Sequence, residues 1–299
     1  MASTVRRRGA LNPNPLRSIT ETEIEQFARD GVIIVKNVFD RAWLDYMRAA
    51  VDEVLTNPGQ YTIDIDKGKK PGRYVFDTWL WPVNDKFREI VFKSPAAAVG
   101  AQVMRAQQVT LVFDFISVKE PNTPKPTLWH QDGPGNPVEG PQSISAWVAL
   151  DKVTRESGAM RMVRGSHRWG RRFEPKGSGD AAVNPNYAGR NKQGTRPVGL
   201  EDMPNIDADP SRYDIVELPC EAGDVVFFDM LTCHASPGNM TDSRRRAIGL
   251  RLAGEQATYA VRNTFLSIHP NIEVGLKDGE HFPARADHHI FPMIWPRAA

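Results

Sequence analysis

The spacing of apolar residues in this 299-residue chain changes from a helical to an alternating period near residue 105. Before that point, the segment from Thr20 to Glu23 has the form of a capping box, and apolar residues follow it at helical spacing. Gly31 is placed to end this first helix. The four apolar residues from Val32 to Val35 then predict a short buried strand.

A second helix is predicted from Asp40, whose carboxylate can accept hydrogen bonds from free backbone N–H groups at a helix start. The sequence Asn57-Pro58-Gly59 stops it. Its apolar positions share one face, as expected for a helix that packs on a core, and they are Leu44, Met47, Val51, Val54 and Leu55.

Beyond residue 105 the alternation predicts strands. Val109, Leu111, Phe113 and Phe115 are expected on one face of the first of them, with polar residues on the other. Similar short segments follow, and they cover residues 144–150, 159–163, 215–218, 225–228 and 247–252. Many short strands after a helical pair predict a mainly β protein with flanking α-helices, built on a double-stranded β-helix (jelly-roll, cupin-like) core.

The length fits a single domain over residues 1–299, in which residues 1–19 are expected to be flexible. The segment 168–212 is polar and rich in Gly, Pro, Asn and Asp. So long an insertion in a β-fold is either a functional lid or a disordered excursion, and the sequence favours neither.

Composition narrows the possible partners and location. The net charge of +2 and the dispersed basic residues give no reason to expect nucleic-acid binding, and no apolar run approaches a membrane span. Two cysteines cannot build a disulfide framework, so we expect a cytoplasmic protein in a reducing compartment. Residues 1–19 lack acidic residues, which leaves an organellar presequence as the alternative. Nothing in the sequence specifies the oligomeric state.

The residues with the clearest chemistry are His130, Asp132 and His234. His130 and Asp132 are separated by one residue, so on an extended strand both side chains would leave the same face. Taken alone, this pair also fits a buried histidine beside a structural carboxylate. His234 follows a distant apolar strand, where a barrel could bring it to the same point. Two histidines and one carboxylate leave half of an octahedral metal shell open, which suits Fe(II) and O2 chemistry.

Several motifs, taken in order, resemble the phytanoyl-CoA dioxygenase family of iron- and 2-oxoglutarate-dependent oxygenases. The likeness extends from Thr20 to about Ala253, and the motifs are Phe27-Ala28-Arg29-Asp30-Gly31-Val32, Trp129-His130-Gln131-Asp132, Ser145-Ala146-Trp147, Gly158 through Gly165-Ser166-His167, and His234 to Ile248.

The resemblance implies roles for particular residues. His130, Asp132 and His234 would bind iron and carry the catalytic centre. Arg245, eleven residues after His234, would bind the far carboxylate of 2-oxoglutarate. The planar, permanently charged guanidinium suits that task. Arg244 and Arg246 would face away from it on a strand.

Four further residues lie in or beside these motifs. Gln131 and Trp147 match positions that also contact 2-oxoglutarate, although strand packing and an ordinary buried aromatic are equally good explanations. His167 matches a turn in which the family's histidine is not a ligand, and Cys233 is interpreted as a packing residue.

The implied reaction is hydroxylation, or another oxidation, of an unactivated C–H bond in a small organic molecule. It would consume O2 and 2-oxoglutarate and release succinate and CO2. Desaturation, epoxidation and rearrangement use the same ligands and stay open, as do the substrate and the position of attack. The competing hypothesis is a cupin-like metal-binding isomerase or a non-catalytic small-molecule sensor, neither of which would need Arg245 or 2-oxoglutarate.

Overall fold

The computed structural model describes residues 10–65, 72–174, 199–262 and 272–297. Within these residues lie four α-helices: α1 (Glu21–Asp30), α2 (Arg41–Thr56), α3 (Asp85–Lys93) and α4 (Ala96–Met104). None of the described helices is long and apolar enough to cross a lipid bilayer.

The strands are all paired antiparallel. They are β1 (Val32–Val35), β2 (Ile63–Asp64), β3 (Tyr74–Thr78), β4 (Val109–Lys119), β5 (Thr127–His130), β6 (Val138–Glu139), β7 (Ser143–Ala149), β8 (Met160–Val163), β9 (Ile215–Leu218), β10 (Val225–Asp229), β11 (His234–Ser236), β12 (Arg245–Ala253), β13 (Thr258–Tyr259) and β14 (Met293–Trp295).

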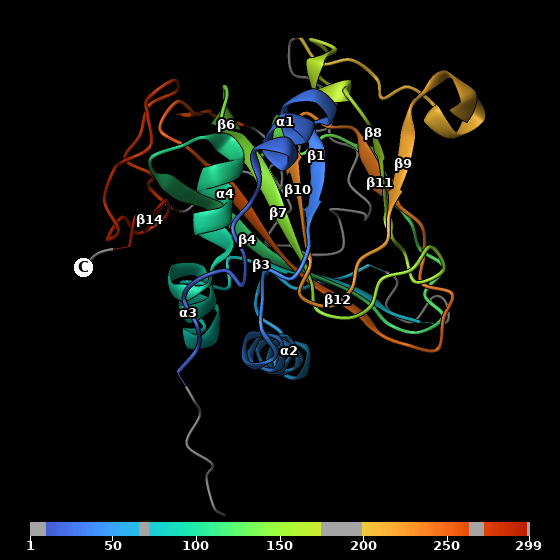
Figure 1. Cartoon of the computed structure of the whole chain (residues 1–299), viewed down its shortest axis with the longest axis horizontal. Coiled ribbons are helices and arrows are strands. Elements are labelled where there is room, and N and C mark those ends of the chain that lie inside the picture. The colour runs from blue at the N-terminus through green and yellow to red at the C-terminus, as the bar shows by residue number, and fades with distance from the viewer. Residues whose placement is uncertain (1–9, 66–71, 175–198, 263–271, 298–299) are drawn as a thin grey trace, which may run out of the picture.

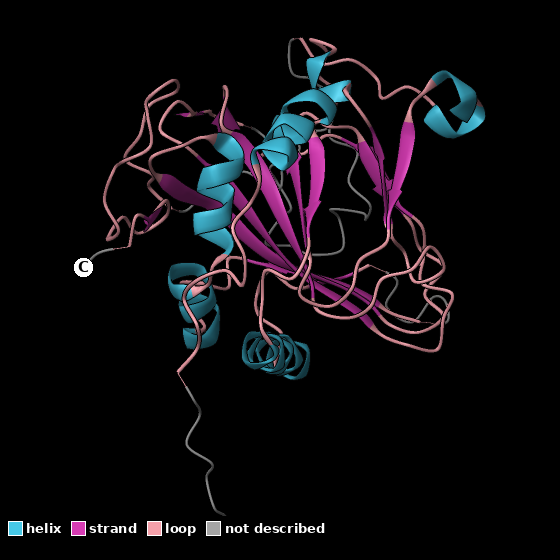
Figure 2. Cartoon of the chain, viewed as in Figure 1, coloured by secondary structure: helices cyan, strands magenta, loops and turns pink. Residues whose placement is uncertain are grey.

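Two main sheets form the jelly-roll core that the sequence predicts. The larger has eight strands in the order β1-β10-β7-β12-β4-β3-β2, with β14 also paired to β4, and the smaller has the order β5-β11-β8-β9. Figure 1 shows the smaller sheet to one side of the larger, with α2, α3 and α4 toward the other side. Figure 2 makes the same division visible by element type.

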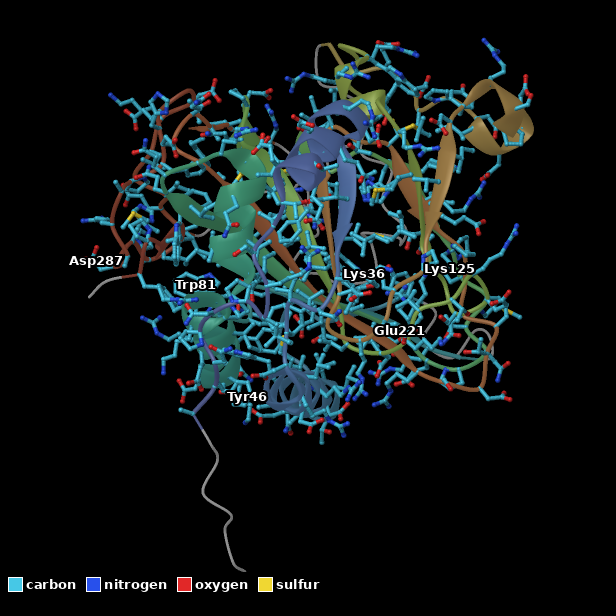
Figure 3. All side chains as sticks on the ribbon, viewed as in Figure 1. Lys36, Tyr46, Trp81, Lys125, Glu221 and Asp287 are labelled. Atoms are coloured by element: carbon cyan, nitrogen blue, oxygen red, sulfur yellow. The ribbon has the colours of Figure 1, made fainter. Side chains whose placement is uncertain are left out.

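Apolar side chains fill two layers. One lies between the large sheet and the helices, and includes Met47 of α2, Val99 of α4 and Phe227 of β10. The other lies between the sheets, and includes Phe228 of β10 and Met162 of β8. Figure 3 shows Tyr46 and Trp81 beside α2 and α3, well away from the smaller sheet. The space between the sheets is where polar side chains of both sheets can meet.

The first two helices begin where the sequence predicts. Thr20 and Glu23 form the reciprocal capping box at the start of α1, and Asp40 accepts a hydrogen bond from the N–H of Trp43 at the start of α2. Gly31 ends α1 with a φ of +75°. A Cβ at this position would lie 2.3 Å from Nδ1 of His167, so both the conformation and the space require glycine.

The face assignment predicted for β4 is wrong for half of its residues. Val109 and Leu111 pack against the helical layer, whereas Phe113 and Phe115 point between the sheets. The cause is a bulge, because Arg251 of β12 pairs with Phe113 while Leu252 pairs with Leu111, which leaves Val112 as an extra residue. One inserted residue exchanges the faces of everything beyond it.

The segment 168–212 is only partly described. A 3-10 turn at Ser166–Arg168 leads into it, and two more, Ile206–Ala208 and Pro210–Arg212, come before β9. Residues 175–198 lie outside the described residues, so the lid hypothesis stays a prediction.

Candidate active site

His130 and His234 face each other across two neighbouring strands of the smaller sheet. They are direct partners in the register of β5 with β11, and their ring centroids are 4.1 Å apart. Asp132 lies just beyond the end of β5 at the start of a 3-10 turn. The three residues bring one ligand atom each to within 4.8 Å of one another. The three metal ligands predicted from the sequence therefore lie together in the fold.

The backbone of Asp132 differs from the prediction. Its φ of −75° and ψ of −43° are helical, so its carboxylate does not join His130 through strand alternation. The chain instead turns directly after the strand, and that turn brings the carboxylate back to the imidazole. Oδ1 of Asp132 lies 3.6 Å from Nε2 of His130 and 3.8 Å from Nε2 of His234.

Backbone carbonyls set the tautomer of both histidines. Nδ1 of His130 lies 2.8 Å from the carbonyl oxygen of Leu128, and Nδ1 of His234 lies 2.9 Å from that of Thr232. A carbonyl can only accept, so each Nδ1 donates its proton and each Nε2 presents a lone pair. Both Nε2 atoms lie on the side of the Asp132 carboxylate. A hydrogen bond from the other ring nitrogen to a backbone carbonyl is typical of metal-binding histidines.

Electrostatics keep these groups in the states that bind a metal. Burial and the neighbouring His130 ring lower the pKa of His234 to about 3, so that its ring is neutral near pH 7. Burial alone would raise the pKa of Asp132, but Arg251, His234 and His130 outweigh it, and the pKa is lowered. Two imidazoles and a carboxylate are the donor types of non-haem iron sites.

Two residues from the large sheet hold the Asp132 carboxylate. Ser145 was placed in a family motif from the sequence without a role, and Arg251 was not identified there. Ser145 of β7 donates to Oδ2 over 2.7 Å, and Nη2 of Arg251 on β12 donates to Oδ1 over 2.8 Å. Both side chains are buried. The spacing could have identified Arg251 from the sequence. It lies six residues after Arg245, and side chains an even number of residues apart on a strand leave the same face.

Arg245 is buried between the sheets and lacks an acidic partner among the described residues. Its Nη1 makes long contacts of 3.5 and 3.4 Å to the carbonyl and hydroxyl of Ser117, and its Nε has no partner. The guanidinium carbon lies 5.4 Å from the Trp147 ring centroid. A buried arginine with unused donors is poised for an anion.

A second buried cation lies beside Arg245. Lys119 of β4 is its direct neighbour in the β12–β4 register, and Nζ donates to Oγ of Ser236 at 2.9 Å and to the carbonyl of Pro237 at 2.6 Å. Burial, followed by the charge of Arg245, lowers the pKa of Lys119. Neither Lys119 nor Ser236 was identified from the sequence. Ser236 could have been found, because it lies two residues after His234 on the same strand and its side chain leaves the same face.

Arg244 and Arg246 face away from this interior, as the sequence analysis expected of neighbours of Arg245. Arg246 pairs with Asp151 and Asp52, and Arg244 pairs with Glu120 and Asp52. Their acidic partners occupy them on the outer surface of the sheet. Of the three consecutive arginines, it is Arg245, eleven residues after His234, that lies between the sheets.

Gln131 is engaged by backbone groups through both atoms of its amide. Its amide nitrogen donates to the carbonyls of Arg171 and Leu231, and its oxygen accepts from the N–H of Phe173. These contacts favour the packing alternative over contact with 2-oxoglutarate. Trp147, by contrast, points between the sheets beside Arg245, where either of its two roles stays open.

Other candidate residues lie elsewhere. Nε2 of His167 is 3.3 Å from the carbonyl of Ala28, beside the end of α1. Cys233 and Cys220 are free and buried, and burial raises the pKa of each thiol to about 12, which makes them unreactive packing residues.

The chain belongs to the phytanoyl-CoA dioxygenase family, because the family model described as Phytanoyl-CoA dioxygenase (PhyH) matches residues 27–247. This confirms the resemblance drawn from the motifs, and the match contains both histidines, Asp132 and Arg245. The protein is accordingly a dioxygenase by family.

Individual relatives agree. An ectoine dioxygenase of Stutzerimonas stutzeri (strain A1501) is 25% identical over 231 residues, which are 74% of this chain and 72% of that protein. A solved structure of the non-heme alpha ketoglutarate dependent carbocyclase SnoK has a TM-score of 0.69 at 25% identity, covering 94% of this chain and 98% of that one. The epimerase SnoN, solved in complex with Fe3+, alpha ketoglutarate and nogalamycin RO, has a TM-score of 0.69 at 22% identity, covering 92% and 98%.

The residues present fit the cofactors of this family. Two Nε2 lone pairs and one carboxylate oxygen supply half of an octahedral shell, and Arg245, which has no acidic partner among the described residues and an unused Nε donor, supplies a receptor for a carboxylate. Iron, 2-oxoglutarate and O2 are therefore the cofactor and co-substrates of this enzyme class, as predicted.

Proposed function

We propose that the protein hydroxylates, or otherwise oxidises, an unactivated C–H bond of a small organic molecule, with release of succinate and CO2. His130, Asp132 and His234 are the metal ligands in this proposal, and Arg245 binds the far carboxylate of 2-oxoglutarate. The observation that carries it is the convergence of three ligand atoms within 4.8 Å, between sheets that also enclose an arginine with no acidic partner among the described residues.

Each residue has a defined task. The carbonyls of Leu128 and Thr232 hold the two Nδ1 protons, so both rings present Nε2 to the metal. When bound, Fe(II) and 2-oxoglutarate supply the activation of O2 and the oxidising power. Arg245 and the hydroxyl of Ser236 orient the co-substrate, and the buried walls keep water away from the reacting centre.

Oxidative ring closure is the second candidate reaction. It is favoured by one observation, the 25% identity and near-complete coverage of a protein described as a carbocyclase. Such a reaction would need the same ligands and the same arginine, so the two outcomes differ only in how the substrate is held.

The test is an anaerobic titration of metal-free protein with Fe(II) and 2-oxoglutarate. We expect a weak visible charge-transfer band from the chelate, and its loss in His234→Ala and weakening in Arg245→Met. Arg244→Gln, which removes a neighbouring arginine from the outer face, is the matched control and should keep the band. A folded wild-type protein without the band would instead support the isomerase or sensor hypothesis.

A further inference from the structure

Arg251 is a buried cation whose donors are mostly unused. One nitrogen, Nη2, holds Oδ1 of Asp132, while Nε and Nη1 have no hydrogen-bond partner in the part of the chain that the structure describes. The side chain is 8% exposed. Leaving buried donors of a charged group unpaired costs free energy, so a partner that supplies acceptors here would be strongly favoured.

Aromatic rings lie close to the Arg251 guanidinium. The guanidinium carbon lies 4.5 Å from the ring centroid of Phe115 and 6.0 Å from that of Phe228. Phe115 can approach so closely because Gly249 is opposite it, where a Cβ would lie 2.0 Å from the ring. Nε and Nη1 lie on opposite sides of the guanidinium, so a carboxylate can accept from one of them with one oxygen and from the second N–H of Nη2 with the other.

A count of charges indicates which molecule brings the carboxylate. Metal-bound histidines are neutral, so Fe(II) contributes two positive charges and Asp132 one negative charge. The keto-acid end of 2-oxoglutarate contributes one more negative charge, and its far carboxylate is matched by Arg245. Lys119 lies beside Arg245 and belongs to the co-substrate end of the site, whereas the charge of Arg251 is left over beside Asp132. A substrate with one negative charge would balance it.

We propose that Arg251 binds a carboxylate of the substrate, so that the enzyme acts on a small organic acid with an apolar body. This inference rests on the proposed function and names its substrate class. The apolar body would lie against the aromatic wall formed by Phe113 and Phe115, where Trp79 packs edge-on against Phe113 at 5.7 Å. Arg251 is then a specificity residue, while Arg245 serves the co-substrate.

The experiment compares acids with their uncharged counterparts. Benzoate, phenylacetate and 3-phenylpropionate, each paired with its amide, are titrated into the anaerobic protein–Fe(II)–2-oxoglutarate complex. Binding is followed by calorimetry and by the shift of the visible band. In the wild-type protein at least one acid should bind about tenfold or more tightly than its amide, because the amide cannot pair with the buried charge.

Arg251→Gln should abolish this preference. Because Arg251 also donates to Asp132, the variant should bind Fe(II) more weakly, so acids and amides are compared at Fe(II) and 2-oxoglutarate concentrations that saturate the visible band of the variant. Arg251→Lys keeps the charge but loses the planar fork, so it should retain the preference in weaker form. If Arg251→Gln does not fold, the comparison of wild type with Arg251→Lys carries the test. Arg246→Gln, on the outer face of the same strand, is the control and should behave as wild type.

Three outcomes would overturn the inference. They are a wild-type protein that prefers no acid to its amide, a preference that survives in Arg251→Gln, and an Arg251→Gln variant whose main defect is weaker 2-oxoglutarate binding. The last would assign Arg251 to the co-substrate. A missing visible band in the wild type is a separate result, because it contradicts the proposed function itself.

Discussion

Ser145 donates a hydrogen bond of 2.7 Å to Oδ2 of Asp132, while Oδ1 of the same carboxylate faces the two imidazoles. The two residues lie on different elements, thirteen positions apart in the sequence. Arg251 donates to Oδ1 as well, so the hydroxyl of Ser145 holds Oδ2 and orients the carboxylate with Oδ1 toward the imidazoles. The large sheet thereby orients a ligand that follows a strand of the small one.

We predict that Ser145→Ala weakens metal binding by about 10- to 100-fold, because removing a partner that orients a ligand has effects of that size. The change also leaves Oδ2 of a buried carboxylate without its donor. Titration of metal-free protein with Co(II), followed by its visible spectrum, measures the affinity. Ser143→Ala, on the same strand but bonded to the carbonyl of Gly140, is the control. Equal affinities in the two variants would remove Ser145 from the site.

Lys119→Met should weaken 2-oxoglutarate binding less than Arg245→Met does. Arg245 has an unused donor, whereas Lys119 is already engaged by Ser236 and Pro237 and acts mainly through its position beside Arg245. We expect a loss of about tenfold for Lys119→Met and of about a hundredfold or more for Arg245→Met. The dissociation constants come from titration of the visible band, and a larger effect at Lys119 would reverse the assignment.

Gln131→Leu should destabilise the fold without weakening 2-oxoglutarate binding. The side chain satisfies three backbone groups, including the N–H of Phe173, and an apolar replacement leaves them unpaired. The expected loss in the free energy of unfolding is about 2–3 kcal/mol, measured by urea denaturation. If stability is unchanged and the co-substrate binds more weakly, Gln131 is a co-substrate ligand after all.

The parts of the fold that could be predicted are those with a local signal. Helices α1 and α2 have side-chain caps and a clear periodicity, and both start where expected. Helix α4 lacks a capping side chain and is nearly all apolar, so neither its start nor a face could be recognised. The bulge at Val112 was invisible because it depends on pairing with β12, which is distant in the sequence.

The candidate site shows the same division. The spacing of His130 and Asp132, and of His234 and Arg245, is local and matched a family pattern. The partners of these residues come from other strands. Ser145, Lys119 and Arg251 meet them only through the register of β7, β4 and β12, which a single sequence does not specify. A charged residue inside an apolar strand, such as Arg251, was the remaining clue.

Asp114 carries a carboxyl group that is buried in the large sheet, on the helical side of β4. Burial raises its pKa to about 7. The N–H groups of Trp81 and Leu80 donate to Oδ2 and lower the pKa, but by less than burial raises it. Its Oδ1 has no partner in the described structure. Between the unfolded value near 4 and about 7, the folded protein holds a proton that the unfolded chain has lost. Folding therefore becomes less favourable as the pH rises through this range.

We expect this group to remove about 2–3 kcal/mol from the free energy of unfolding between pH 5 and pH 8. Asp114→Asn keeps an acceptor for both N–H groups and cannot ionise, so its stability should fall less over that interval and exceed that of the wild type at pH 8. Urea denaturation at the two pH values provides the comparison, with the exposed Asp242→Asn as control. Equal pH dependence in Asp114→Asn and wild type would mean that Asp114 is ionised in the folded protein across the whole range.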